Sequence, residues 1–511
     1  MERARADRAR AEKPQAYRPR VRFRYALAAL GIASLALSGA LTALAWPLAD
    51  VARANAARAG AAEPGTTLAV LRVPTSAGIS DAVAKPMPAL PAPIDPSDFR
   101  PTDPVLADLG QLLFYDPILS GNQNISCGTC HNHDHASADG LSLPVGEGGM
   151  GLGPKREMGG GIGAAVRRVP RHSPVLFNLG HHSVRTLFHD GRLAVDPNEP
   201  SGFEHPLLEG RRHDLPAGLD GIVAAQAMFP VTSETEMRGH ADENDVALNG
   251  ARSTPEVWAR IARRIGEIPE YVALFVAAFP DIEDRGDITY AHAANAIADF
   301  IETEWRSVDA PFDRWLAGEA TALNAQEARG AALFFGEAGC AACHSGPLFS
   351  DGEHHAVAMP QIGPGRTRLF SDGAFDRGRM NVTNRREDAY RFRTPTLRNV
   401  AATAPYGHAG AYSKLESVVR HHLDPAAMLE AYDPDEAILA RHDALAVTDF
   451  LAHEDARERA RIAAVSELEA RDLPPGAVAD LVAFLGTLSD PIALEGRRGK
   501  PDRVPSGLPV D

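Results

Sequence analysis

Two copies of one short pattern contain all four cysteines of this 511-residue chain. Residues 127–131 read Cys-Gly-Thr-Cys-His, and residues 340–344 read Cys-Ala-Ala-Cys-His. C-x-x-C-H is the attachment site of c-type haem. The two thiols of one turn form thioethers with the porphyrin, and the following histidine binds the iron. The sequence therefore predicts two covalent haems, held by Cys127, Cys130, His131, Cys340, Cys343 and His344.

Two other uses of paired cysteines explain this pattern less well. Two C-x-x-C pairs could build a structural zinc site with four thiolate ligands, but such a site has no need of the histidine that follows each pair. A thioredoxin-like redox pair would require alternating strands and helices, and neither motif has such surroundings.

The N-terminus has the pattern of an export segment. Residues 1–24 carry nine basic and three acidic side chains, and residues 26–49 form an uncharged apolar run. A basic stretch, an apolar run and the small residues Ala54-Asn55-Ala56 are typical of a signal peptide. The run is also long enough for a single-pass membrane anchor. We expect residues 1–56 to be one or the other, and the rest of the chain to be periplasmic, either soluble after cleavage or tethered to the inner membrane.

The exported part is strongly acidic. The net charge is −15, and it becomes −21 without the +6 of residues 1–24. Such a surface excludes nucleic acid as a partner and can attract a basic electron-carrier protein. Residues 57–101 are rich in Ala and Pro and predict a disordered linker, and residues 491–511 predict a disordered tail.

The remaining chain reads as a duplication. "GQLLFY" at residues 110–115 precedes the first haem motif, and "GAALFF" at residues 330–335 precedes the second. "SPVLFNLG" at residues 173–180 matches "TPTLRNVA" at residues 394–401, and a His-x-Gly follows each. Each half would therefore hold one haem.

The local patterns are mostly helical. Asp103 and Pro104 suit a helix start, with Leu109 and Leu113 on one face, and Asn324 and Glu327 have capping-box spacing. Alternating strands are absent. The sequence predicts two cytochrome-c-like α-helical domains, at residues 102–315 and 316–490, wrapped by long loops that include a glycine-rich loop at residues 146–163.

These motifs resemble the bacterial dihaem cytochrome c peroxidases and their relatives in methylamine utilisation, which oxidise a partner protein. The resemblance covers roughly residues 103–488, and "TPTLRNVAATAPYGHAGAY" is a specific part of it. It implies an N-terminal haem that reacts with peroxide and a C-terminal haem that transfers electrons.

The stretch "AAQAMFPVTSETEMRG" is similar to the family's peroxidatic loop. The resemblance implies that Gln226 and Glu236 are catalytic. A carboxylate beside the iron can carry a proton between the two oxygens of peroxide, and an amide can hold them by hydrogen bonds. Glu234 is the local competitor for the acid-base role.

Two positions depart from the family pattern. "LFHDGR" has His189 where the family has a Trp between the haems, so His189 is the candidate electron relay. Members that need reductive activation carry a distal His, whose position falls near Ala164 here. With no His at that position, we expect a first haem that is five-coordinate at rest.

The segment "TAPYGH" is similar to the family's calcium segment. The resemblance implies that Thr403 and Pro405 offer carbonyl oxygens. His172 stands where the family has an Asn ligand, and imidazole suits calcium poorly. Calcium is therefore a possible cofactor beside the two haems.

The second haem needs a distal ligand, and the family places Met or Tyr at the position of His422. Leu415, Val418 and His422 fall on one face of a helix that Ser413 and Glu416 would cap. His421 faces elsewhere. Met380 and Met428 are the alternative ligands.

Three functions remain open. The first is a periplasmic peroxidase that reduces hydrogen peroxide with electrons from a small cytochrome c or cupredoxin. The second is a relative that oxidises aromatic residues of a partner protein. The third is a non-enzymatic dihaem electron carrier, which would saturate both irons, whereas Gln226 and Glu236 indicate one open iron.

Overall fold

The computed structural model describes residues 90–161, 163–205, 215–248, 253–366 and 375–510. The chain falls into two units, Met1–Pro74 and Thr75–Asp511, and the first lies wholly outside the described residues. The predicted export segment at residues 1–56 and most of the predicted linker therefore lie outside them as well. None of the helices in the described ranges has the length and apolar character needed to cross a bilayer.

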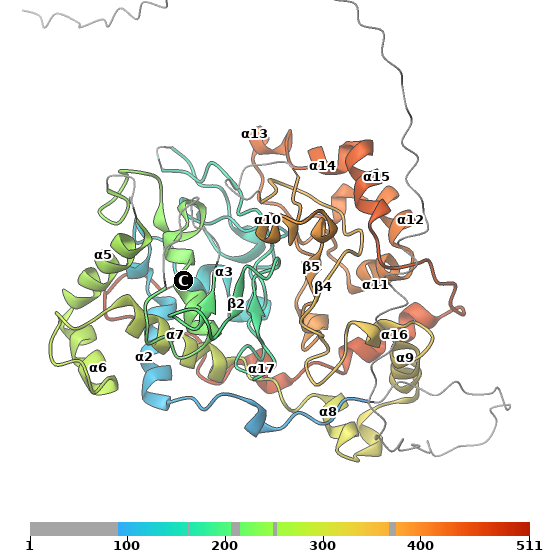
Figure 1. Ribbon diagram of the computed structural model, residues 1–511, viewed down its shortest axis with the longest axis horizontal. Helices are drawn as coiled ribbons and strands as arrows, with labels where there is room; N and C mark the ends of the chain where they lie inside the picture. The colour runs from blue at the N-terminus through green and yellow to red at the C-terminus, as the bar shows by residue number, and fades with distance from the viewer. Residues whose placement is uncertain (1–89, 162, 206–214, 249–252, 367–374, 511) are drawn as a thin grey trace, which may run out of the picture. The chain divides into compact units, whose positions relative to one another are not determined.

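Helices make up most of the regular structure, and the strands are few and short (Figure 1). The helices up to the middle of the chain are α2 (Pro104–Tyr115), α3 (Cys127–Cys130), α4 (Ile222–Ala227), α5 (Thr254–Gly266), α6 (Pro269–Ala278) and α7 (Tyr290–Glu304). Those that follow are α8 (Pro311–Leu316), α9 (Ala325–Phe335), α10 (Met380–Thr383), α11 (Leu415–Leu423), α12 (Pro425–Glu430), α13 (Asp443–Ala446), α14 (Leu451–Glu454), α15 (Ala456–Ala464), α16 (Ala477–Gly486) and α17 (Pro491–Glu495). The antiparallel strands β1 (Thr186–Leu187), β2 (Leu193–Val195) and β3 (Phe203–Glu204) form one sheet, and β4 (His354–His355) pairs with β5 (Phe392–Arg393).

The predicted helix starts before both haem motifs are confirmed. Asp103 caps α2 by accepting a hydrogen bond from the Val105 N–H, with Pro104 as the first helical residue. Asn324 caps α9, and Glu327 completes the capping box. These local signals position the two helices that lead into the haem-attachment turns.

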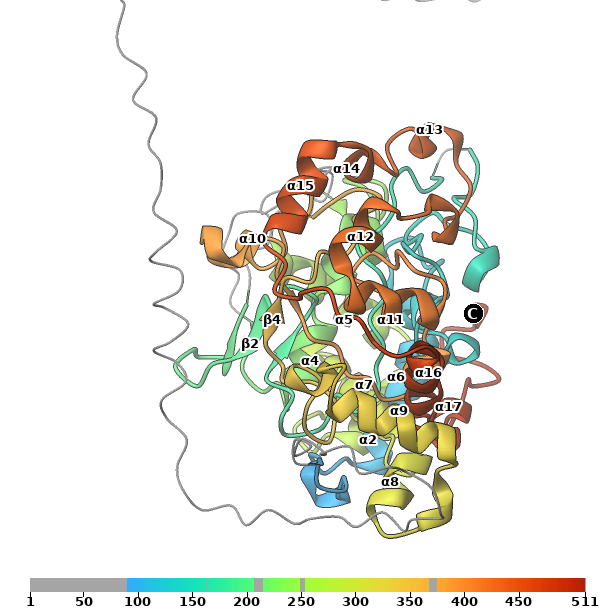
Figure 2. The same ribbon diagram turned by 90° about the vertical axis from the view of Figure 1, so that its right-hand side faces the viewer.

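Two helix pairs, α2 with α7 and α9 with α16, pack in the same way (Figure 2). A Cβ added to Gly110 would lie 1.9 Å from the carbonyl oxygen of Ala296, and one added to Gly330 would lie 1.9 Å from that of Asp480. Only glycine allows the backbones to approach so closely. In both pairs a Phe of the later helix stacks near this crossing, Phe300 in the first and Phe484 in the second.

Two hydrophobic clusters form the main core of the described residues. The first surrounds α2 and α7, and the second surrounds α9 and α16. Phe312 is fully buried in the second cluster, although the predicted boundary at residue 315 assigned it to the first domain. The second core therefore includes residues that precede this boundary, among them Phe312 on α8.

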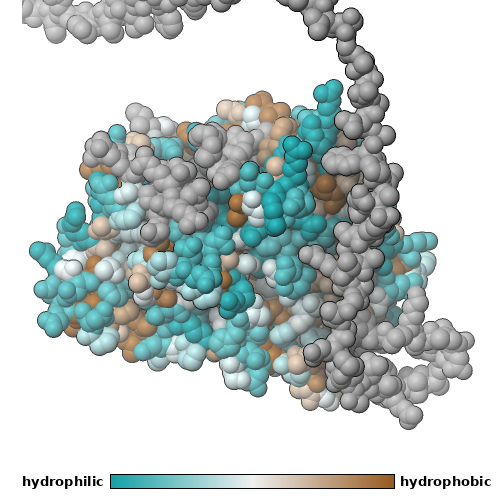
Figure 3. Space-filling view, viewed as in Figure 1, coloured by the Kyte–Doolittle hydropathy of each residue, from teal (hydrophilic) through white to brown (hydrophobic). Residues whose placement is uncertain are grey.

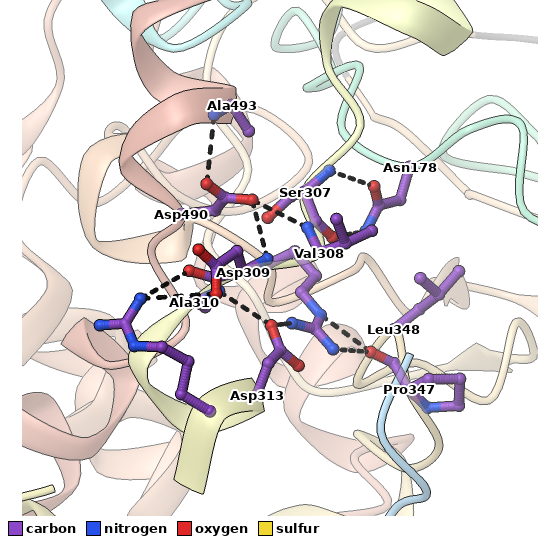
Figure 4. A network of polar contacts seen from close by, with 12 residues as sticks. Asn178, Ser307, Val308, Asp309, Ala310, Asp313, Pro347, Leu348, Asp490 and Ala493 are labelled. Carbon is purple, nitrogen blue, oxygen red and sulfur yellow. Dashed lines mark hydrogen bonds and ion pairs between the residues drawn. The ribbon is translucent and has the colours of Figure 1, made fainter. Parts of the chain in front are cut away.

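The segment between α7 and α8 is fixed by a polar network (Figure 4). Asp490 accepts hydrogen bonds from the backbone N–H groups of Val308 at 2.8 Å and Asp309 at 3.0 Å. Asn178 accepts one from the Ser307 N–H at 2.6 Å. Because these acceptors come from distant parts of the chain, the connection between the two cores is held in one conformation.

Residues 90–101, which belong to the predicted disordered linker, are ordered. Phe99 is buried against the ring of His181, with ring centroids 5.2 Å apart. Arg100 forms ion pairs with Glu302 and Asp299 on α7. The linker prediction is wrong here because a few anchoring side chains outweigh the Ala- and Pro-rich composition.

The predicted disordered tail at residues 491–511 is also ordered up to residue 510. It begins with α17, buries Val504, and bonds the Ser506 hydroxyl to Asp116 at 2.6 Å. The backbone N–H groups of Arg498 and Gly499 donate to Glu304. This segment has the composition of a disordered tail, but its polar groups bond to buried partners at the ends of α2 and α7.

The face of the molecule in Figure 3 is mostly hydrophilic, with apolar residues in separate spots. The large apolar side chains of the described residues are mainly in the buried clusters.

Candidate functional site: two haem-attachment turns

Each C-x-x-C-H motif forms one tight turn. The first is α3, and its His131 N–H donates to the Cys127 carbonyl at 2.9 Å. The second begins with a 3-10 turn at Cys340–Ala342, where the His344 N–H donates to the Cys340 carbonyl at 3.0 Å. The four cysteines are free and partly buried. Both turns therefore present two thiols and one imidazole, the donor set that c-type haem requires.

Both proximal histidines are oriented by a backbone carbonyl. Nδ1 of His131 bonds to the Ser137 carbonyl oxygen at 2.9 Å, and Nδ1 of His344 bonds to that of Phe349 at 3.0 Å. Burial lowers the pKa of His131 and lowers that of His344 to about 4. Both rings are therefore neutral, with Nδ1 as the donor and Nε2 available to iron.

A second imidazole faces His344. The rings of His344 and His422 have centroids 6.3 Å apart and planes inclined by 58°. Two imidazoles on opposite sides of one metal, each with a metal–nitrogen bond of about 2 Å, have centroids about 6 Å apart. Nδ1 of His422 bonds to the Val418 carbonyl at 2.8 Å, which leaves its Nε2 free. The geometry therefore fits a haem iron between the two rings.

The neighbouring residues fit this assignment, with one correction. His421 points away, and bonds to the Tyr412 hydroxyl at 3.0 Å and the Val357 carbonyl at 2.8 Å. The predicted capping box from Ser413 and Glu416 is wrong, because α11 begins at Leu415 after Lys414 and the Ser413 N–H bonds to Glu436 instead.

The two alternative methionine ligands are on other helices than His422. Met428 is on α12 and packs against the second hydrophobic cluster, while Met380 begins α10.

The first haem motif has a different environment. Within the described ranges, no other histidine ring faces His131 as His422 faces His344. Ala164, at the predicted position of the distal ligand, lies against Gly148 of the glycine-rich loop. The neighbouring Glu147 N–H in turn bonds to the Thr235 carbonyl at 3.3 Å. The loop thus covers the segment that carries the candidate catalytic acid.

Glu236 lies in a π-helical turn, Glu234–Arg238. A Cβ on Gly146 would lie 2.9 Å from the Glu236 Cα, so the glycine-rich loop packs directly on this residue. Burial raises the pKa of Glu236, and the charges of Arg192 and Arg366 oppose that rise. Burial and the charge of Asp139 raise the pKa of Cys130 most, and the charge of Glu236 adds to that rise, which indicates that this carboxylate lies near the first haem motif.

Gln226 is on α4, and one short 3-10 turn separates this helix from the π-helical turn that contains Glu236. Its Oε1 atom is buried and has no hydrogen-bond partner. A buried amide oxygen without a partner is uncommon in folded proteins and indicates that a ligand or water completes the site. The two candidate side chains do not hydrogen-bond to each other.

Glu234, the competitor for the acid-base role, is engaged elsewhere. Its carboxylate bonds to Nδ1 of His240 at 2.6 Å and is partly exposed. Glu236 is therefore the better placed of the two acids.

His189 lies where the two halves of the chain meet. Its Nε2 donates to the His172 carbonyl at 2.9 Å, and its own carbonyl accepts from the Arg393 N–H at 2.7 Å. The pKa of His189 is lowered to about 3 by burial and by the charge of Arg171, so the ring is neutral. His189 therefore contacts residues from both halves of the chain, and its role as an electron relay stays a prediction.

The predicted calcium segment has no clear support. Thr403 is buried, and its hydroxyl bonds to the Val400 carbonyl at 3.2 Å. His172 uses Nδ1 to bond to the Leu141 carbonyl at 2.9 Å. Calcium at Thr403 and Pro405 stays a prediction.

A cluster of buried ion pairs was not foreseen from the sequence. Arg171 pairs with Asp376 at 2.7 Å and with Asp190 at 2.8 Å. Asp190 also pairs with Arg192 at 3.1 Å. Arg171 and Asp376 lie 205 positions apart along the chain, so no local pattern could have revealed their pairing.

With Arg366 and Arg393, the buried arginines in and around this cluster outnumber the carboxylates near them. Burial and the charge of Arg366 lower the pKa of Arg192 to about 9, and burial lowers that of Arg393 to about 10. The guanidinium of Arg192 also stands 3.3 Å from the Phe188 ring centroid. Buried arginines without enough anions suit carboxylate ligands, and the propionates of haem are carboxylates.

Known proteins are similar to this chain in sequence. The family profile described as "Di-haem cytochrome c peroxidase" matches residues 104–321. The methylamine utilization protein MauG of Methylorubrum extorquens is 30% identical over 324 residues, which cover 63% of this chain and 70% of that protein. The cytochrome c551 peroxidase of Pseudomonas aeruginosa is 31% identical over 312 residues, covering 61% and 70%. The cytochrome-c peroxidase IdrP1 of Denitromonas iodatirespirans is 30% identical over 435 residues, covering 76% and 94%.

The fold is also found among solved structures. A MauG-like protein associated with microbial copper homeostasis superposes with a TM-score of 0.50 at 25% identity, over 79% of this chain and 95% of that one. Together with two haem-attachment turns of matching chemistry, these similarities show that the chain belongs to the dihaem cytochrome c peroxidase family.

Proposed function

We propose that this protein is an exported peroxidase that reduces hydrogen peroxide to water at its first haem. A small cytochrome c or cupredoxin would supply the electrons through the second haem. The main support is a contrast among the described residues: His344 has a second imidazole opposite it, and His131 has none. An iron with an open position can bind peroxide, whereas an iron with two imidazoles is suited to electron transfer.

The residues beside the first haem would handle protons and orientation. The haem, when bound, supplies the iron that holds peroxide and passes electrons. Glu236 would take the proton from the inner peroxide oxygen and return it to the outer one as the O–O bond breaks. The side-chain amide of Gln226 would hold the peroxide by hydrogen bonds. The buried, unpartnered Oε1 of Gln226 supports this role, because a bound molecule can satisfy it.

His189 would carry electrons between the two halves. Its ring is neutral and bonded to the His172 carbonyl, so it is fixed in place rather than mobile. The surplus of buried arginines beside it, including Arg192 and Arg393, would hold the haem propionates.

We also propose that the two halves arose by duplication, as the sequence predicted. The matching backbone contacts of Gly110 and Gly330 support this relationship, because both glycines open the repeated Gly-x-x-Leu-Phe segment. The export signal at residues 1–56 remains part of the proposal, because attachment of c-type haem requires transport out of the bacterial cytoplasm.

The deciding experiment measures stoichiometry with the purified holoprotein. A peroxidase consumes two equivalents of a reduced small cytochrome for each hydrogen peroxide. An enzyme that oxidises a partner protein would keep both oxidising equivalents when the small donor is added, and would release them only to that partner. A carrier would leave peroxide unchanged, and that result would refute the proposal.

A further inference from the structure

A buried tyrosine lies directly against the first haem-attachment turn. Tyr115 is the last residue of α2, and only 2% of its surface is exposed. A Cβ added to Gly128 would lie 2.5 Å from two carbons of the Tyr115 ring. Gly128 lies between the two cysteines of the motif, so the ring packs on the turn that carries the first haem.

The Tyr115 hydroxyl is bonded to a histidine. Its oxygen bonds to Nδ1 of His133, and Nε2 of His133 lies 2.8 Å from Oε1 of Glu304. A carboxylate only accepts hydrogen bonds, so Nε2 carries a proton; in the neutral ring Nδ1 then accepts from the tyrosine hydroxyl. The arrangement is a continuous chain from phenol to imidazole to carboxylate.

Glu304 is held as an anion. It is fully buried, and burial alone would raise its pKa, but hydrogen bonds from His133 and from backbone N–H groups lower it. Those N–H groups belong to Arg497, Arg498 and Gly499, at 2.7 to 2.9 Å from the carboxylate. The ordered C-terminal segment thus fixes a negative charge behind His133.

This chain of residues has the parts needed for coupled loss of an electron and a proton. Burial and the charge of Glu304 raise the pKa of Tyr115 well above its ordinary value, so the phenol is neutral. A neutral phenol is hard to oxidise unless a base takes its proton in the same step. His133 is that base, and Glu304 stabilises the imidazolium that forms.

We propose that Tyr115 is a one-electron redox site of the peroxide-treated enzyme. The oxidant is the first haem group after it has reacted with hydrogen peroxide, so this inference rests on the proposed function. Tyr115 gives one electron to that group, and its hydroxyl proton moves to Nδ1 of His133. The products are a neutral phenoxyl radical and an imidazolium whose Nε2–H remains bonded to Glu304. When an electron returns, the proton moves back to the phenoxyl oxygen.

The site would store one oxidising equivalent inside the first core when no electron donor is present. It would keep that equivalent away from the protein surface, since Tyr115 and Glu304 are buried. It also protects the haem by removing the equivalent from the porphyrin.

Other aromatic residues provide controls. Tyr290 is also buried and lies close enough to Cys127 for that thiol to influence its pKa. Its hydroxyl donates to the Ala227 carbonyl at 3.3 Å, and a carbonyl cannot take up a proton as imidazole does. Trp305, whose ring centroid is 5.1 Å from that of His133, is the nearest competing radical site.

The test is freeze-quench electron paramagnetic resonance of the holoprotein mixed with hydrogen peroxide and no donor. We expect an organic radical signal that narrows when the protein is made with ring-deuterated tyrosine. The signal should disappear in Tyr115→Phe and persist in Tyr290→Phe and Trp305→Phe. His133→Gln keeps a hydrogen-bond acceptor but no base, and should reduce the yield strongly. Persistence of the signal in Tyr115→Phe, or its loss only in Trp305→Phe, would overturn the proposal.

A parallel optical measurement separates the two proposals. If peroxide changes the haem spectrum of the wild-type protein but no tyrosyl radical forms, the inference about Tyr115 fails and the peroxidase proposal stands. If peroxide leaves the haem spectrum unchanged, the proposed function itself fails. The resting haem spectrum of Tyr115→Phe should match the wild type, which confirms that the variant is folded and loaded.

Discussion

The centroids of the His344 and His422 imidazole rings lie 6.3 Å apart with the ring planes inclined by 58°, and each ring is fixed by a hydrogen bond from Nδ1 to a backbone carbonyl. The gap between the rings has the width that one metal ion with two imidazole ligands requires. This relationship separates the second haem site from the first, where His131 has no such partner among the described residues.

Replacing His422 with Met should raise the reduction potential of the second haem, because thioether stabilises the reduced iron more than imidazole does. The variant should also gain the long-wavelength absorption band of a His/Met haem. Redox titration of the holoprotein checks both effects. Met428→Leu is the matched control, since it keeps the packing of α12 and should change neither property. An altered potential in Met428→Leu, with His422→Met unchanged, would refute the ligand assignment.

The position of His422 on α11 could be predicted because its signal is local. Leu415, Val418 and His422 recur at helical spacing, and Leu415 and Val418 pack against the second cluster. The caps at Asp103 and Asn324 were predictable for the same reason. The predicted capping role of Ser413 was wrong, because Glu436, which lies beyond α11, accepts the Ser413 N–H instead.

The sequence composition could not predict that the C-terminal segment is ordered. Its hydrogen bonds go to Glu304 and Asp116, whose burial depends on the packing of α2 and α7. The arginine cluster around Asp190 could not be predicted from the sequence for a similar reason, since Arg171 and Asp376 pair across the whole fold. Sequence patterns reveal contacts within an element, whereas these contacts exist only after the two halves assemble.

Replacing Glu236 with Gln should lower kcat for peroxide reduction by about 10² to 10⁴-fold, the range for loss of a general acid-base group. Steady-state kinetics with a reduced small cytochrome measures this. Glu234→Gln, which removes the charge that pairs with His240 and Arg238, should retain most of the activity. Equal losses in the two variants would contradict the assignment of Glu236.

The pH profile gives an independent test of Glu236. Burial raises its pKa above the ordinary value of 4.5. Only the ionised carboxylate can accept the peroxide proton, so activity should fall as the pH drops through this raised pKa, and should be fully present above it. The acid limb should be absent in Glu236→Gln. A limb that is unchanged in that variant would mean that another group titrates.

Adding a methyl group at Gly110 or Gly330 should destabilise the protein by about 1–3 kcal/mol or more, because each Cβ would overlap a carbonyl oxygen of the partner helix. Gly110→Ala and Gly330→Ala should therefore lower the melting temperature. Gly486→Ala is the control, since α16 has open space at that position and alanine favours helix. Thermal unfolding of the three holoproteins should separate them, and an effect at Gly486 as large as at the other two would contradict the close-packing argument.

The spin state of the resting enzyme tests the central claim most directly. Electron paramagnetic resonance of the diferric holoprotein should show one high-spin haem at the His131 site and one low-spin haem with two imidazole ligands at the His344 site. Hydrogen peroxide should remove the high-spin signal without prior reduction. A fully low-spin enzyme that stays inert to peroxide until one haem is reduced would contradict the account, because some residue would then have to close the first iron.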